Sequence, residues 1–148
     1  MAKQSMASIQ RFATNLQTVV DTTEETGNNV APFYEKLATA LEADKLADMP
    51  KAEFQEIAAE FNDATEVYEA NAGRLNGAQA PIKMIGMYSN LKKHYAAYAQ
   101  ACRAMTDSLN VAEQTVDVEA FNAAGSAQEE EMDKVSATIQ KMMGQANF

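Results

Sequence analysis

The sequence predicts an all-α fold, an elongated antiparallel up-and-down bundle of about four helices. Apolar residues recur at spacings of three and four in four separate segments, which places them on one stripe of a helix in each. Only 6 Gly and 3 Pro are present, whereas residues that favour helices, such as Ala, Glu, Gln, Met and Lys, are plentiful. Long helices joined by short links pack as antiparallel neighbours. We therefore expect a single helical-bundle domain, residues 1–148.

The first apolar stripe predicts one long helix that is kinked near Pro32. Its heptad register continues without a shift through residues 27–32. Two interpretations compete: Pro32 removes a backbone donor inside a continuous helix, or Asn28 or Asn29 caps a second helix that Pro32 starts. We favour the kinked helix, because a loop has no reason to preserve the heptad phase. The stripe consists of Ile9, Phe12, Leu16, Val19, Thr23, Thr26, Val30, Phe33, Leu37 and Ala40.

The third segment has the strongest helical pattern, eight stripe positions without a polar interruption. They are Met84, Tyr88, Leu91, Tyr95, Tyr98, Cys102, Met105 and Leu109. The second segment runs from Phe54 to Leu75 and the last from Val118 to Met142, and both stripes are interrupted. Breaks are predicted at residues 48–50, 73–81 and 110–117, where Pro, Gly, Asn and Asp gather.

The charge distribution favours pairing of the third helix with its neighbours. Residues 1–47, 48–75, 76–112 and 113–148 carry net charges of −2, −5, +3 and −5. A basic helix between two acidic ones favours an antiparallel arrangement in which it contacts both. The total of −9 disfavours nucleic acid as a partner, because that charge repels a phosphate backbone.

Features that report on location are few. The single cysteine, Cys102, cannot form an internal disulfide and suits a reducing compartment. Neither a secretory leader nor an apolar run long enough to span a membrane is visible, so we expect no membrane insertion. A cytoplasmic location is the default expectation, and export without a leader stays an alternative.

The residues that carry chemistry form no recognisable catalytic, cofactor or metal site, so we expect no enzyme activity and no cofactor. His94 is the only histidine and belongs to no Glu-x-x-His pair of the kind that holds di-iron sites in bundles. Cys102 lies on the apolar stripe, where burial raises the pKa of a thiol. The consecutive carboxylates Glu129, Glu130 and Glu131 point in three directions and are interpreted as a solvated face.

The interruptions on the stripes leave two interpretations open. They are Thr23, Thr26, Asn71, Gly125 and Gln128. These residues either face one another and line a small polar cavity, or serve as buried polar groups that fix helix register. We prefer the register interpretation, and an open pocket around Asn71 and Gln128 would favour the cavity.

Methionine is unusually frequent, with nine residues, six of them in the last two helices. Flexible thioethers fill irregular cores, but they also coat grooves that accept varied partners. The core interpretation is favoured. If an exposed apolar docking segment exists, we expect it at Met142, Met143 and Phe148, close to the C-terminus.

In size, acidity and lack of a leader the chain resembles the small helical proteins of type VII secretion, but only in architecture. No tryptophan is present for a Trp-x-Gly turn, and no tyrosine is followed four positions later by Asp or Glu. A long kinked helix also resembles BAR-like membrane-bending proteins, whose basic concave face only the third helix could supply here. The chain is assigned to neither family.

Three functional hypotheses follow. The favoured one is a non-enzymatic helical protein–protein interaction module that associates with itself or with a partner helix, with the Met-rich stripes as contact surface. The second is a secretion-associated or phage-type structural or adaptor protein. The third is a small-ligand-binding bundle, which requires polar groups converging inside the core.

Overall fold

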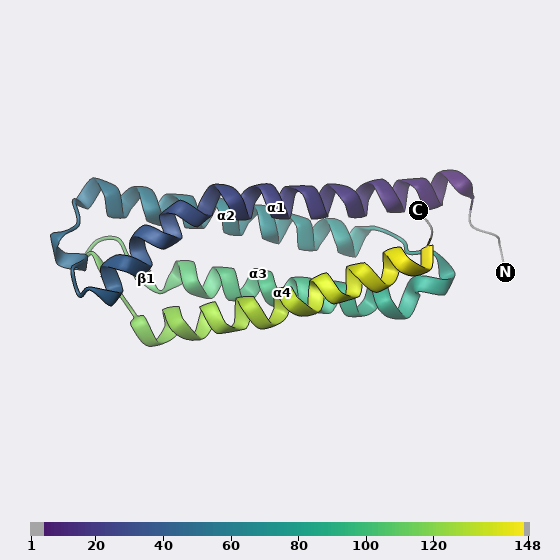
Figure 1. Cartoon of the computed structure of the whole chain (residues 1–148). Coiled ribbons are helices and arrows are strands. Elements are labelled where there is room, and N and C mark those ends of the chain that lie inside the picture. Colours follow the sequence, from purple (N-terminus) through teal and green to yellow (C-terminus); the bar gives the residue numbers. More distant parts are fainter. Residues whose placement is uncertain (1–4, 147–148) are drawn as a thin grey trace.

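The structure is a computed structural model that describes residues 5–146. Within them the chain forms four α-helices, which are α1 (Met6–Glu42), α2 (Lys51–Gly77), α3 (Ile85–Asp107) and α4 (Val118–Ala146). Each of α2, α3 and α4 packs along the helix before it, and the directions alternate (Figure 1). The predicted all-α up-and-down bundle is thereby confirmed.

Helix α1 is continuous through Pro32, as the unbroken heptad register indicated. It begins after Ser5, whose hydroxyl oxygen accepts a hydrogen bond from the backbone N–H of Ser8 at 3.0 Å. Residues 27–32 are helical, so no second helix begins at Pro32. Proline removes one backbone donor from the helical ladder and crowds the preceding turn. Figure 1 shows that α1 changes direction in its second half.

The core consists of two hydrophobic clusters that follow one another along the bundle. One lies toward the chain termini and includes Phe12, Leu16, Leu75, Met84, Tyr88, Leu91, Tyr95 and Met142. The other lies toward the α1–α2 and α3–α4 connections and includes Leu37, Phe54, Ile57, Phe61, Met105, Leu109 and Phe121. Seven of the eight predicted stripe positions of α3 are buried, and Tyr98 is half-buried. This part of the sequence pattern is confirmed.

The connection between α3 and α4 is a short antiparallel ribbon, β1 (Leu109–Asn110) and β2 (Thr115–Val116), where the sequence predicted only a break. Gln114 sits at its tip with a φ of 54°. The Gln114 amide nitrogen donates to the carbonyl oxygens of Leu46 and Met49 at 3.1 and 2.6 Å. The ribbon is thus tied to the α1–α2 connection, which contains the 3-10 turn η1 (Leu46–Asp48). A second such turn, η2 (Ile82–Met84), precedes α3.

A buried polar layer joins three helices. Asn71 of α2 is 2% exposed, and its amide nitrogen donates to the hydroxyl oxygens of Thr22 at 2.9 Å and Tyr95 at 3.1 Å. Thr23 and Tyr95 share a further hydrogen bond of 2.7 Å. Among residues 5–146 every buried side-chain nitrogen and oxygen atom has a hydrogen-bond partner. Because each of these bonds crosses from one helix to another, sliding a helix by one turn would break it.

Replacing Asn71 by Ala should lower the free energy of unfolding by about 1 to 3 kcal/mol, because the Thr22 and Tyr95 hydroxyls lose a buried partner. Urea unfolding followed by circular dichroism measures the change. Asn76→Ala, at an exposed position of the same helix, is the matched control and should change stability by less than about 0.5 kcal/mol. Equal effects of the two substitutions would contradict the importance of the layer.

Candidate interaction surface

Charge is segregated along the length of the bundle. All 21 acidic residues fall within residues 21–69 and 107–133. Nine of the 12 lysines and arginines lie outside these ranges, namely Lys3, Arg11, Arg74, Lys83, Lys92, Lys93, Arg103, Lys134 and Lys141. The start of α1, the end of α2, the start of α3 and the end of α4 lie together at one end of the bundle (Figure 1). We call this the basic end, and the opposite end, with both remaining connections, the acidic end.

The basic end presents exposed cations on α1, α2 and α4 and on the turn η2 before α3. Arg11, Arg74, Lys83 and Lys141 are exposed, and none forms an ion pair with another residue of 5–146. Since no acidic residue occurs in the segments that meet here, nothing in the sequence near them neutralises their charge. The surface is therefore positive although the chain as a whole carries −9.

A groove of about 860 Å³ runs between the start of α1 and the end of α2 at the basic end. Arg11 and Arg74 line it, together with the amides of Gln10, Asn15 and Gln79. The Asn15 amide nitrogen donates to the backbone carbonyl oxygen of Arg74 at 3.3 Å and joins the two helices across the groove. Guanidinium groups and primary amides donate hydrogen bonds that carboxylate oxygens accept. The groove suits an anionic, oxygen-rich surface.

Exposed apolar side chains accompany these cations. Seven large hydrophobic residues are exposed among those that the structure describes, and four belong to segments that meet at the basic end. These four are Met6, Ile82, Ile85 and Met143, with exposed fractions of 73%, 49%, 56% and 41%. Clustered apolar groups rimmed by charge mark contact surfaces more often than scattered ones do.

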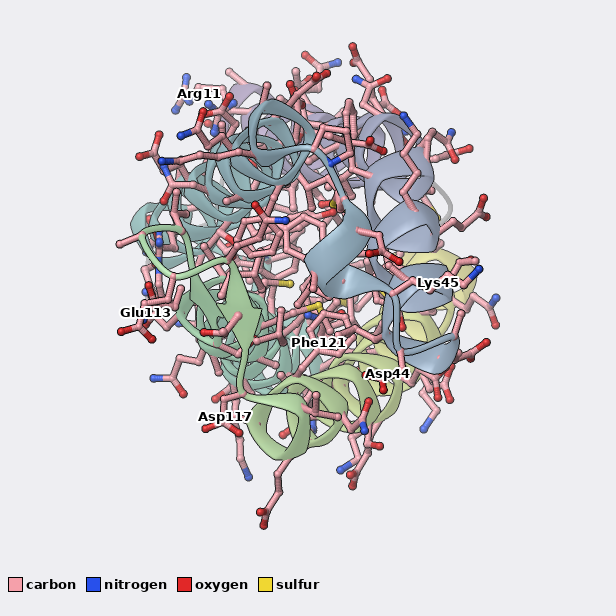
Figure 2. The ribbon with its side chains drawn as sticks, turned by 90° about the vertical axis from the view of Figure 1, so that its left-hand side faces the viewer. Arg11, Asp44, Lys45, Glu113, Asp117 and Phe121 are labelled. Carbon is pink, nitrogen blue, oxygen red and sulfur yellow. The ribbon has the colours of Figure 1, made fainter. Side chains whose placement is uncertain are left out.

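The acidic end carries the opposite charge. Figure 2 views it end-on and shows Asp44, Glu113 and Asp117 around its rim, with Phe121 directed inward. Glu42 at the end of α1, Asp48 in η1 and Glu119 in the first turn of α4 add carboxylates at this end, and Lys45 and Lys51 are the nearest cations in sequence. Val111 and Val118 are 39% and 47% exposed at this end.

Ion pairs on the flanks join α3 to both neighbours, and the charge pattern predicted contact of this helix with both. The Arg103 guanidinium contacts the Glu69 carboxylate at 2.8 Å, and this hydrogen bond lowers the pKa of Glu69. His94 of α3 contacts Glu131 of α4 at 2.7 Å. Glu131 is half-buried, so the prediction of a solvated face is wrong for Glu131, and the exposed Glu129 and Glu130 agree with it.

The predicted docking residues are separated by the fold. Met142 is 0% exposed and belongs to the core, because it lies on the stripe of α4 that packs against α3. The expectation that it is exposed is therefore wrong. Met143 is exposed, and Phe148 lies outside the described residues. Met84 and Met105 are buried too, so these methionines fill the core and offer no contact surface.

A pocket of about 200 Å³ lies in the middle of the bundle, where the two core clusters meet. Gly27, Tyr68, Cys102 and Gln128 are among its lining residues. Asn71 does not line this pocket, and its amide belongs to the buried polar layer. The polar interruptions of the stripes therefore do not converge on one cavity.

Cys102 faces this pocket as a buried thiol. Burial raises its pKa to about 12, as the stripe position indicated. Neighbouring Tyr98 lies in the same lining, and burial raises the pKa of its phenol as well. Both groups are thus neutral at physiological pH, and neither offers an anion or a nucleophile.

Among the residues that the structure describes, neither a metal-binding group nor a membrane-spanning helix accompanies these surfaces. Within residues 5–146, no three His, Cys, Asp or Glu side chains are grouped so that they could hold a metal ion. No helix in this range has the length and apolar character needed to cross a membrane. Comparison with protein-family models, with curated proteins and with solved structures finds no match to this chain.

Alkylation of Cys102 should be slow in the folded chain. At pH 9.0 an ordinary thiol with a pKa of 9.0 is ionised in half of the molecules. A thiol with a pKa of about 12 is ionised in about one molecule in a thousand at that pH. We expect iodoacetamide to react with native protein at least about 500-fold more slowly than with protein in concentrated guanidinium chloride. Mass spectrometry over time measures both rates, and native reaction within tenfold of the unfolded rate would contradict the buried, neutral thiol.

Proposed function

We propose that this chain is a non-enzymatic helical protein–protein interaction module whose contact surface is the basic end of the bundle. The observation that carries the proposal is the segregation of charge: four exposed, unpaired cations and four exposed apolar side chains gather where no acidic residue occurs. Keeping such charges together without a partner gives no benefit to folding, because like charges repel.

The chemistry of this surface indicates an acidic protein partner. Arginine side chains at the groove offer bidentate donors for carboxylates, and the amides of Gln10, Asn15 and Gln79 add neutral ones. Exposed Met and Ile side chains supply apolar area beside them. Electrostatic complementarity of this kind raises the rate of encounter and selects partners by charge.

Binding to immobilised poly-L-glutamate tests the surface with a defined acidic polymer. Wild-type chain should be retained at low salt despite its net charge of −9 and should elute as salt is raised. The variant with Arg74→Glu, Lys83→Glu and Lys141→Glu should bind at least about tenfold more weakly, because three favourable contacts become repulsive.

The matched control changes the same number of charges at positions away from the basic end. Lys36→Glu, Lys45→Glu and Lys51→Glu also lower the net charge from −9 to −15, since each variant replaces three cations by three carboxylates. This control keeps the basic end intact and should therefore be retained more strongly than the basic-end variant of equal net charge. Equal loss in both variants, or no retention of the wild type, would overturn the proposal.

A second candidate function is binding of a small apolar molecule in the mid-bundle pocket. Its volume of about 200 Å³ is below the range of about 300 to 1,000 Å³ typical of ligand sites, yet an apolar cavity of about 150 Å³ can hold benzene. Gln128 is one of its polar lining residues, beside Thr65 and Thr106, and the Gln128 amide nitrogen donates to the Met105 sulfur at 3.6 Å.

Thermal unfolding in the presence of benzene tests the pocket. A ligand that binds only the folded state raises the melting temperature as its concentration increases. We expect a saturable rise, and a smaller one in Ala31→Leu, where a larger side chain fills part of the lining. An unchanged melting temperature at the solubility limit of benzene would remove this candidate.

A further inference from the structure

The acidic partner that the basic end requires is present on the chain itself. The acidic end carries exposed carboxylates at Glu42, Asp48 and Glu113, none of which forms an ion pair within residues 5–146. Exposed valines, Val111 and Val118, lie beside them. Both ends are cross-sections of the same bundle (Figure 1) and are therefore similar in size, while their charges are opposite.

We infer that the acidic end of a second copy of this chain docks on the basic end, so that copies associate head to tail. This inference rests on the proposed function and names its partner. A contact between two different surfaces of one molecule is heterologous and leaves a free end of each kind, so that further copies add to both ends.

The exposed apolar residues favour contact at the ends over contact along the sides. Two antiparallel copies side by side would also bring unlike charges together. Of the seven exposed large hydrophobic residues, however, six lie in segments at the two ends. The seventh, Tyr34, is on a flank, where its ring stacks on Phe121 of the same chain with centroids 5.8 Å apart. The apolar area available to a partner is therefore at the ends.

The size of the contact predicts weak, salt-sensitive association. Helices about 10 Å in diameter give a four-helix bundle roughly 20 Å across, so each end offers roughly a few hundred Å². Such a contact is at the low end of specific interfaces and relies on charge for selectivity. Measurements up to about 1 mM protein are needed, at low salt and again at about 1 M salt, where the Debye length is only about 3 Å.

Light scattering and sedimentation velocity provide the first test. At low salt, the weight-average mass of wild-type chain should rise above 16.1 kDa with concentration and continue past twice that value. At high salt it should return to the monomer mass. A monomer at every concentration would overturn the inference, as would a mass that stops at twice 16.1 kDa, which indicates a closed dimer.

Charge reversal at each end separately provides the sharper test. The basic-end variant is Arg74→Glu, Lys83→Glu and Lys141→Glu, and the acidic-end variant is Glu42→Lys, Asp48→Lys and Glu113→Lys. Each variant alone has two ends of one sign and should stay monomeric. An equimolar mixture restores unlike ends and should associate. Association of either variant alone, or none in the mixture while both give the circular dichroism spectrum of the wild type, would overturn the inference.

Two further measurements separate this inference from the proposed function. Retention on poly-L-glutamate without any self-association would leave the basic end as an interaction surface and reject the second copy as its partner. Co-sedimentation of monomeric wild-type chain with phosphatidylserine vesicles, lost in the basic-end variant, would assign the basic end to an anionic membrane surface and likewise overturn the inference.

Discussion

The alternating direction of the four helices is the constraint on which the surface of this molecule depends. Acidic residues occupy two blocks of the sequence, residues 21–69 and 107–133, separated by segments that contain none. Only a chain that reverses at each connection brings the start of α1, the end of α2, the start of α3 and the end of α4 to one end (Figure 1). The topology thereby converts a pattern of charge along the sequence into two ends of opposite sign.

The buried polar layer determines where these charges lie relative to one another. An apolar heptad stripe alone tolerates sliding by one helical turn, because one apolar residue replaces another. The hydrogen bonds from Asn71 to Thr22 and Tyr95 join α1, α2 and α3 at one level and do not tolerate that shift. The ribbon contributes a second fixed point, since Gln114 binds the carbonyl oxygens of the α1–α2 connection. Register at both levels is therefore set by polar contacts, and the apolar core supplies the stability.

The helices could be predicted because their signals are local, whereas most of the surface could not. The unbroken register of α1 through Pro32 and the uninterrupted stripe of α3 depend only on residues a few positions apart. The ribbon, the Gln114 contacts and the His94–Glu131 pair depend on residues distant in sequence. The prediction that Met142 is exposed is wrong because nearness to the chain end does not determine exposure, and the heptad position of Met142 lies on the core stripe. The two ends differ in charge along the folded length, a difference that the net charge of each helical segment does not contain.

The separation of charge also limits the ways in which copies of the chain can meet. Two basic ends repel each other, as do two acidic ends, and parallel copies side by side repel along their whole length. The unlike ends are the pairing in which charge attracts and the exposed apolar residues also meet. Repulsion of the wrong arrangements therefore contributes as much to selectivity as attraction in the right one. A bundle with the same core but with its 21 carboxylates spread evenly would lack both effects.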